Sequence, residues 1–422
     1  MTAINTGHPH QASPPPQGVE PVSRTAASRF PFAWIPVRCR RQAAEALPMY
    51  VRPRFGKSAG EISGALGDLG TFLPHIIGAI TVVGMAPAGI LTTFGLFYIF
   101  TGAFYGLPIA VQPMKAASAA VLVEPVSPEV IAGVGLVLGL FFLVAAVTGL
   151  IDRLARAIPE TVAAGLQLGL GLSLAMLGLS LMADQPWFAA AMCALAIVLL
   201  RGGRLPAALI VLGVGTAAGQ AFGIAEPFPD LKIGLHLPPL VIPDWAAIAT
   251  GIEHAVLPQI PLTLTNAIIV TAAVTRQLFP KEVVPVTERN LSLTTGIGNL
   301  LAAPFGGYPM CHGAGGVAAH HRFGARTATA PLLIGLMFLA LGLFLGDGGY
   351  ALLRMVPDAV LGTLLLVSGL ELALSSKPMR FDARDRTVLT LVGVICLLAN
   401  PAAAFVAGWP LAFTARRLWP RR

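Results

Sequence analysis

The chain has 422 residues, of which 55% are hydrophobic and only 11% are charged, and its mean hydropathy is +0.75. A water-soluble protein of this size needs far more polar surface, so the composition excludes an ordinary soluble domain. The formal net charge of +8 would favour nucleic acid as a partner of a soluble protein. Here the basic residues lie between long apolar runs, where membrane orientation explains them better. We therefore expect a polytopic membrane protein that does not bind nucleic acid.

Residues 1–57 form a polar segment, first rich in Pro and Ser and then carrying eight Lys and Arg. This composition predicts a disordered basic N-terminal tail. An Arg-rich, acid-poor leader is also typical of an organellar transit peptide, whereas no apolar signal-peptide core is visible. Met49 is an alternative start, so the presence of residues 1–48 in the native protein stays open.

Fourteen apolar segments follow the tail and are predicted to cross the membrane. Runs such as Ile131–Leu150, Thr161–Met182 and Thr329–Leu345 contain no charge and approach the roughly 20 residues that a span requires. With a cytoplasmic N-terminus, all but three of the 28 Lys and Arg fall on the cytoplasmic side or in the tails. We therefore expect an inner-membrane protein with both termini in the cytoplasm. The predicted spans are centred near residues 72, 97, 115, 140, 171, 194, 213, 265, 297, 314, 338, 363, 392 and 408.

An extracytoplasmic linker, residues 225–244, divides the spans seven and seven. An odd number of spans inverts the second half in the membrane, so repeats over 58–224 and 245–415 are predicted, followed by a basic C-terminal tail, 416–422. The third and tenth spans both place Pro-Met before small residues, in QPMKAASA from Gln112 and YPMCHGAG from Tyr308. Short, Pro-interrupted segments at matching positions are typical of transporters with inverted repeats. The predicted fold is therefore all-α, with about 14 spans.

The two Pro-Met segments predict a site for an anion. Pro113 and Pro309 are expected to be the first residues of short half-helices, because proline suits the first helical turn. The first N–H groups of such helices lack intrahelical acceptors, and the positive end of the helix dipole attracts an anion. A kinked, tightly packed helix is the alternative. The predicted binding residues are Gln112, Pro113, Met114, Lys115, Ala116, Pro309, Met310, Cys311, His312, Gly313 and Asn266.

Lys115 is the only Lys or Arg deep within an apolar span. A cation there costs at least about 2.5 kcal/mol, so it needs a partner or a task. Attraction to a dianion is one task, and a structural ion pair with Asp68 or Glu371 is the alternative. Gln112 and Ser118 are candidate donors to the ligand, or else satisfy nearby backbone.

Three titratable side chains are candidates for coupling transport to protons: Asp68, which lies among glycines in the first span, His312 and Glu371. The two carboxylates have the alternative of simple hydration at a membrane end. His320 lies beside Arg322, where we expect contact with water or lipid headgroups. No metal or cofactor is expected, because Cys311-His312 has no second pair of ligands at suitable spacing.

The motifs resemble the bacterial and plant molybdate transporters, which are related to the sulfate permease superfamily. The resemblance covers residues 58–415 and implies a core domain that binds an oxyanion between the third and tenth spans, a gate domain, and no ATPase. It also implies that homodimers are common. Sulfate permeases typically carry a C-terminal cytoplasmic domain, for which this chain has no room, so we expect the molybdate branch. The matching motifs are Gly67–Thr71, Gln112–Ala116, Asn266 with Thr275-Arg276, Pro309–Gly316 and Arg322–Arg326.

The sequence therefore predicts a secondary active importer of molybdate, with sulfate as the alternative substrate. Both are tetrahedral dianions, and physical reasoning from one sequence does not separate them. A channel and a membrane-embedded enzyme are the competing classes; neither HExxH nor paired acid clusters are present. Moving a dianion against a negative interior needs a driving ion; a proton is one candidate, and sodium coupling and anion exchange are the alternatives.

Overall fold

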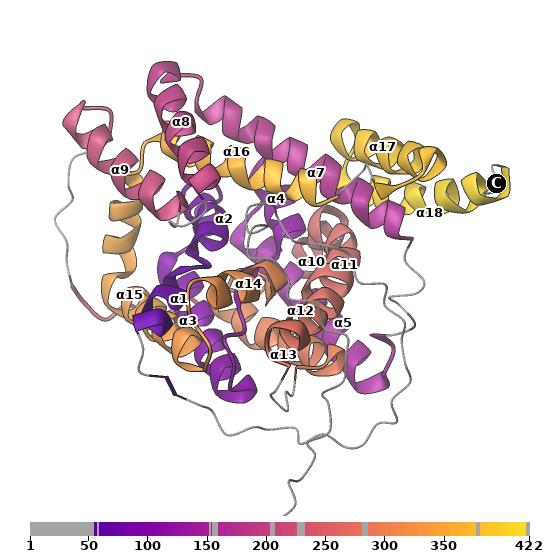
Figure 1. The fold of residues 1–422 in the computed structure, drawn as a ribbon, viewed down its shortest axis with the longest axis horizontal. Coiled ribbons are helices and arrows are strands. Elements are labelled where there is room, and N and C mark those ends of the chain that lie inside the picture. The colour runs from indigo at the N-terminus through magenta and orange to yellow at the C-terminus, as the bar shows by residue number, and fades with distance from the viewer. Residues whose placement is uncertain are drawn as a thin grey trace, which may run out of the picture. The chain divides into compact units, whose positions relative to one another are not determined.

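Helices account for nearly all of the regular structure in the computed structural model (Figure 1). The structure describes residues 55–56, 59–151, 153, 159–202, 207–225, 233–280, 286–376 and 380–418. All of these residues belong to one compact unit, Ala46–Arg422. The basic tail predicted for residues 1–57 lies outside the described residues, apart from Phe55 and Gly56.

The first half of the chain forms helices whose ends follow local sequence signals. Pro87 and Pro128 each lie in the first turn of a helix, where the missing N–H costs nothing. Gly106 and Gly149 end the same two helices in the left-handed conformation, which glycine adopts without strain. The elements are α1 (Ala59–Leu66), α2 (Leu69–Thr81), α3 (Pro87–Tyr105), β1 (Val111–Pro113), α4 (Lys115–Val123), α5 (Pro128–Thr148), α7 (Glu160–Leu181), α8 (Pro186–Gly202) and α9 (Ala207–Ala221).

The second half begins with a continuous helical run, 245–278, that two π-helical segments interrupt. Such segments break the regular hydrogen bonding of a helix and often mark functional sites. The elements are α10 (Trp245–Gly251), η1 (Ile252–Val256), α11 (Leu257–Leu262), η2 (Thr263–Val270), α12 (Thr271–Leu278), α13 (Glu288–Ala302), η3 (Ala303–Phe305), β2 (Met310–His312), α14 (Ala314–Arg322), α15 (Thr329–Arg354), α16 (Asp358–Ser375), α17 (Ala383–Leu398) and α18 (Pro401–Leu418).

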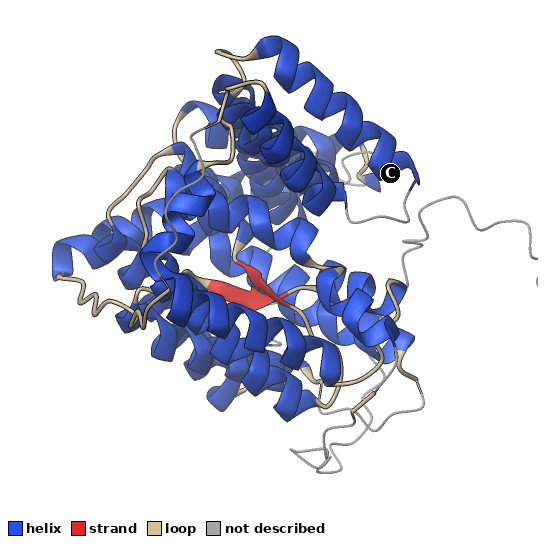
Figure 2. Ribbon diagram, turned by 90° about the vertical axis from the view of Figure 1, so that its left-hand side faces the viewer, coloured by secondary structure: helices blue, strands red, loops and turns tan. Residues whose placement is uncertain are grey.

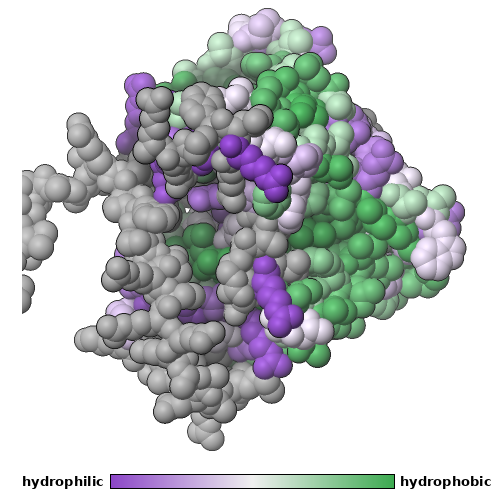
Figure 3. Space-filling view, turned by 90° about the vertical axis from the view of Figure 1, so that its right-hand side faces the viewer, coloured by the Kyte–Doolittle hydropathy of each residue, from purple (hydrophilic) through white to green (hydrophobic). Residues whose placement is uncertain are grey.

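Six helical stretches in the described part of the chain are long and apolar enough to cross a membrane. Large apolar side chains also lie exposed, among them Leu398, Leu374 and Val198 at 83%, 72% and 67%. Figure 3 shows apolar residues spread over a broad area of one face. A water-soluble surface rarely exposes so much apolar area, so the chain is an integral multi-pass membrane protein. The count of fourteen spans stays a prediction.

The helices form two groups. The site bundle consists of α1–α5 and α10–α15; the flanking bundle consists of α7–α9 and α16–α18 and lies along the upper part of Figure 1. Three helix pairs approach so closely that a Cβ added to a glycine of one helix would lie 2.5–3.0 Å from a backbone atom of the other helix. The pairs are Gly95–Gly335 between α3 and α15, Gly139–Gly296 between α5 and α13, and Gly178–Gly362 between α7 and α16.

Two three-residue strands cross in the middle of the helices (Figure 2). β1 pairs antiparallel with β2, with Val111 opposite His312 and Pro113 opposite Met310. The prediction of a purely helical fold is therefore wrong at this point, as is the prediction that Pro113 and Pro309 begin helices. Both prolines lie in extended backbone before α4 and α14, where the pairing needs no proline N–H.

Candidate functional site

The strand crossing places the starts of α4 and α14 close together. Each helix follows its strand after one residue, Met114 or Gly313, and each strand is only three residues long. The two helix starts therefore lie at the two ends of one short strand pair. Both helices have nine residues, or about 13 Å, which is less than half of the hydrocarbon thickness. The N–H groups of both first turns point back toward the strand pair that precedes each helix.

A side-chain amide caps the start of α4. The Ala117 N–H donates to Gln259 Oε1 at 2.8 Å, and Gln259 Nε2 donates to Thr263 Oγ1 at 2.7 Å. Gln259 and Thr263 are 2% and 0% exposed and come from α11 and η2. The Gln259 oxygen therefore occupies a place where an anion oxygen could accept the same hydrogen bond.

Lys115, the first residue of α4, is half-buried. Among the described residues, no ion pair joins Lys115 to Asp68 or Glu371. Glu371 is exposed on α16 and does not belong to the buried polar cluster. Lys115 is close enough to Asp68 and Cys311 to act on them electrostatically. The structure thus brings Lys115 to the crossing without a directly paired carboxylate.

The start of α14 differs from that of α4, because it consists of small residues and no side chain covers it at Gly315. Gly315 is exposed, and a Cβ at this position would meet no atom within 4 Å. Gly316 is buried, and a Cβ there would lie 2.5 Å from Asp68 Oδ2. Glycine at 316 therefore allows the Asp68 carboxylate to lie against the first turn of α14, where the helix dipole favours a negative charge.

Asp68 forms the centre of a buried polar cluster between α1 and α2. Its side chain is fully buried, and Oδ1 accepts from Gln112 Nε2 at 2.5 Å and from Thr71 Oγ1 at 2.6 Å. Tyr98 OH lies 3.5 Å from Oδ2. Gln112 Nε2 also lies 2.7 Å from Thr71 Oγ1, so Asp68 and Thr71 hold the amide of a predicted binding residue.

His312 supports β2 rather than projecting freely into the crossing. Its Nδ1 lies 3.1 Å from the Ala110 carbonyl and its Nε2 lies 2.8 Å from Thr294 Oγ1. Asn299 on α13 holds the neighbouring residue, because its Oδ1 accepts from the Met310 N–H and its Nδ2 donates to the Met310 carbonyl, at 2.9 and 2.6 Å. α13 therefore fixes the backbone of β2 with buried side chains.

Ser118 contacts His75, whose ring joins the two bundles. His75 Nδ1 lies 2.7 Å from Ser118 Oγ on α4, and Nε2 lies 2.9 Å from Ser368 Oγ on α16. All three side chains are at most 9% exposed. The start of α4 is thus connected to the flanking bundle by a buried polar chain.

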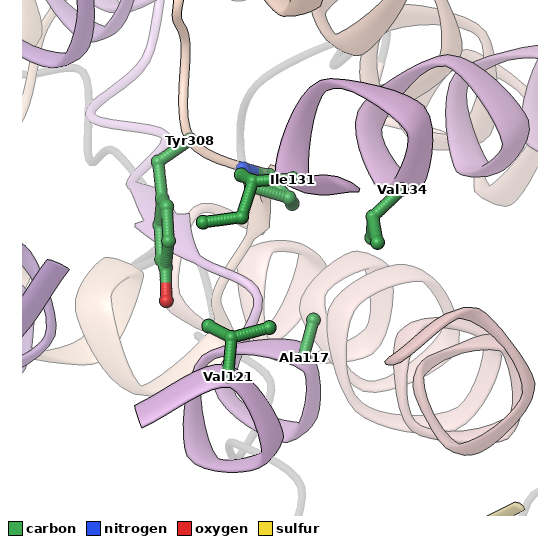
Figure 4. A pocket seen from close by; sticks show the side chains of 6 residues that line it. Ala117, Val121, Ile131, Val134 and Tyr308 are labelled. Atoms are coloured by element: carbon green, nitrogen blue, oxygen red, sulfur yellow. The ribbon is translucent and has the colours of Figure 1, made fainter. Parts of the chain in front are cut away.

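A narrow apolar cavity lies beside the start of α4, lined by Ala117, Val121, Ile131, Val134, Tyr308 and Pro309 (Figure 4). The Tyr308 hydroxyl points toward the turn of α4 that carries Val121. It is close to Ser118 but meets no partner at hydrogen-bond geometry among the described residues. Tyr308 is therefore a buried donor next to the crossing.

The exposure of Asn266 and of His320 differs from what the sequence predicts. Asn266 is exposed on η2, and the neighbouring buried amide of Gln259 contacts α4 in its place. His320, expected at a water or headgroup surface, is fully buried. It lies four residues after Gly316 on α14, so the same helix face that contacts Asp68 carries it onto α1.

The sequence also offers Gln259 and Thr263 as neutral donors of the eighth span, whereas sequence reasoning missed Asn299 and His75 as contributors to this region. The signal in the sequence is that Gln259 and Asn299 are polar amides within apolar helices. This signal is weak, because most such amides form hydrogen bonds to neighbouring helices. No group of three His, Cys, Asp or Glu side chains suited to a metal occurs in the described ranges.

Comparisons with known proteins agree on the family. The model described as "Molybdate transporter of MFS superfamily" matches residues 60–174 and 251–372, which include both strand–helix segments. Molybdate transporter 1 of Arabidopsis thaliana is 32% identical over 406 residues, covering 84% of this chain and 87% of the relative. Molybdate transporter 2 of the same plant is 30% identical, covering 82% and 84%.

Solved structures agree on the fold. The transmembrane domain of a cyanobacterium bicarbonate transporter, BicA, aligns with a TM-score of 0.64 at 18% identity, covering 84% of this chain and 98% of that domain. SLC26A9 aligns with a TM-score of 0.63 at 15% identity, covering 84% and 64%. These likenesses show a shared fold. With the family model matching more than half of the chain, the chain belongs to the molybdate transporter family, whose members are transporters and not enzymes.

Proposed function

We propose that the chain is a secondary active transporter that imports molybdate, bound between the starts of α4 and α14. The single observation that carries the proposal is the β1–β2 pairing, which joins the segments leading into two short helices, so that both helix N-termini adjoin one strand pair. The names of the relatives support molybdate as the substrate. In this proposal α4 and α14 are the half-helices of the third and tenth spans.

The anion site combines backbone and charge. The N–H groups of two first turns, one of them at the open Gly315, are donors that need no side chain. Lys115 adds a positive charge, and Gln112, Met114, Ala116, Pro309, Cys311 and Gly313 frame the crossing. A tetrahedral dianion offers four oxygens to such donors, so it would displace the Gln259 oxygen from the Ala117 N–H.

Asp68 is the coupling residue in this proposal, in preference to His312 and Glu371. A charged Asp68 beside α14 repels the dianion and holds the Gln112 amide. Protonation of Asp68 removes the repulsion and weakens that hydrogen bond, so Gln112 becomes available to the anion. His312 has both ring nitrogens engaged, and Glu371 is exposed. Proton symport also offsets the cost of moving a dianion inward, about 2.3 kcal/mol per charge per 100 mV.

The site bundle and the flanking bundle act as core and gate domains in this proposal. The glycine pairs support a seven-plus-seven inverted repeat over 58–224 and 245–415. In such a repeat, α3 of the first half corresponds to α13 of the second, α5 to α15, and α7 to α16. The α3–α15 contact then corresponds to the α5–α13 contact, and the α7–α16 contact joins two corresponding helices. Transport then consists of movement of the core against the gate in the inner membrane, with both termini cytoplasmic; a homodimer is the proposed assembly.

Sulfate is the second candidate substrate, because it has the same charge and shape. The test is uptake of labelled molybdate by cells that lack their own transporter and express this chain, with unlabelled tungstate, sulfate or uracil in excess. We expect tungstate to suppress uptake and sulfate and uracil to leave it unchanged. Saturable sulfate uptake without molybdate uptake would overturn the substrate and keep the site. No uptake of either anion would overturn the proposal.

A further inference from the structure

His320 lies buried in α14, and among the described residues only one of its two ring nitrogens has a hydrogen-bond partner. Its Nδ1 lies 2.6 Å from the Gly64 carbonyl oxygen. A carbonyl only accepts, so Nδ1 carries the hydrogen and, in the neutral ring, Nε2 carries a lone pair. The Nε2 atom is buried and has no hydrogen-bond partner among the described residues. A buried polar atom without a partner is costly, so its retention needs a reason.

The elements packed on α14 carry the following titratable groups. From α1, Glu61 is 2% exposed; its Oε1 accepts from the Arg326 N–H at 3.0 Å, and its Oε2 has no described partner. Asp68 is close enough to interact electrostatically with His320. From α12, Arg276 binds Glu288 at 2.8 Å and is half-exposed, whereas η2 carries no titratable residue.

The remaining charged neighbours lie at one end of α14. His321 and Arg322 are its last residues, and Arg326 follows in the chain. Asp68 lies against Gly316 near the other end. Three buried titratable groups, Asp68, His320 and Glu61, therefore lie along α14 between the strand crossing and the Arg-rich end of the helix. His320 Nε2 and Glu61 Oε2 have no hydrogen-bond partner among the described residues.

We propose that His320 is a proton relay: its Nε2 takes the proton that Asp68 releases and passes it to Oε2 of Glu61. This proposal rests on the proposed proton-coupled transport. The O–H bond of Asp68 breaks, an N–H bond forms at Nε2 and gives an imidazolium, and Asp68 becomes a carboxylate. The N–H bond then breaks as an O–H bond forms on Glu61, which restores the neutral ring. The Gly64 carbonyl accepts from Nδ1–H throughout, so Nε2 both takes up and releases the transferred proton.

The test uses the full chain in proteoliposomes and the variant His320→Asn. Asparagine keeps an N–H donor for the Gly64 carbonyl but cannot carry a proton. His321→Asn is the matched control, because it makes the same change one residue away on the side chain that packs against Phe279. Two rates are measured: molybdate uptake driven by a pH gradient, and exchange of external labelled for internal unlabelled molybdate.

We expect His320→Asn to lower gradient-driven uptake at least tenfold and to leave exchange within twofold, since exchange needs binding and movement but no net proton release. His321→Asn should keep both rates. Gradient-driven uptake that survives in His320→Asn overturns the relay alone. Loss of exchange together with driven uptake, in a variant that melts like the parent, also overturns it, because His320 would then serve binding or movement.

Two further outcomes separate the relay from the proposed function. A parent protein whose uptake ignores the pH gradient overturns the proposed coupling and, with it, the relay. Should His320→Asn fail to fold, Glu61→Gln tests the same path, because the amide oxygen still accepts from the Arg326 N–H while the proton acceptor is lost. Unchanged driven uptake in Glu61→Gln then overturns the relay.

Discussion

The starts of α4 and α14 follow similar Pro-Met segments and yet are built differently. The start of α4 is closed: Gln259 caps Ala117, and Lys115 is the first residue. The start of α14 is open at Gly315, with a carboxylate against its first turn. α4 also contacts the flanking bundle at α7, whereas α14 packs on α1, α12 and η2 of the site bundle.

This difference indicates a division of labour between two related segments. In the proposed transport cycle, α4 contributes a positive charge and a connection to the interface between core and gate, and α14 contributes bare backbone beside the proposed proton site at Asp68. Both contribute N–H groups, because a helix start offers them whatever its side chains are. A substitution at one start should therefore change a different property from a substitution at the other.

The largest effect is expected for Lys115→Ala. A charge-assisted contact to a partly buried dianion contributes about 1.5–3 kcal/mol, so the KM for molybdate should rise roughly tenfold to 100-fold. Lys115→Arg is the control, because it keeps the charge and should recover most of the affinity. The measurement is concentration-dependent uptake at fixed pH. An unchanged KM in Lys115→Ala would assign the anion to another place.

Gln259→Glu tests the closed start. A carboxylate would accept from the Ala117 N–H and imitate the anion, and its charge would repel molybdate. We expect the KM to rise by about tenfold or more, and Gln259→Ala, which removes the cap without adding charge, to change it much less. Equal effects of the two variants would show that the cap serves only to hold α11 against α4.

Gly315→Ala tests the open start. A methyl group meets no atom there, and alanine stabilises a helix by up to about 1 kcal/mol relative to glycine. The melting temperature should stay equal or rise while the KM increases by roughly tenfold, because the methyl group blocks close approach to the backbone N–H. Gly213→Ala on α9, where a Cβ also meets nothing, is the matched control and should leave uptake unchanged. Normal uptake by Gly315→Ala argues against backbone binding at α14.

The smallest effect is expected for Ser368→Ala, which removes the His75 contact on the flanking bundle. One neutral hydrogen bond contributes about 1 kcal/mol, so the maximal uptake rate should change about fivefold or less, with the KM unaltered. Ser118→Ala breaks the other end of the same chain and lies next to the site, so it should alter the KM as well. An identical kinetic change in both variants would contradict the separation of binding from movement.

Particular residues show how far the sequence predicts this site. Lys115, Asp68 and the two Pro-Met segments stand out because charge and proline are rare within apolar runs, and all of them lie at the crossing. His320 was placed wrongly, because its neighbour Arg322 indicates a surface while its own helix face packs on α1. Pro113 and Pro309 were predicted to begin helices but lie two and five residues before α4 and α14, because proline suits both a first turn and extended backbone.

Hydropathy and charge, which are local properties, determined the membrane class, the apolar spans and the positions of unusual polar residues. Only the tertiary structure decided how those residues combine. The pairing of Val111 with His312 and the capping of Ala117 by Gln259 join segments far apart in the chain. Such contacts depend on which helix faces meet, and that is set by close packing over the whole molecule rather than by any single segment.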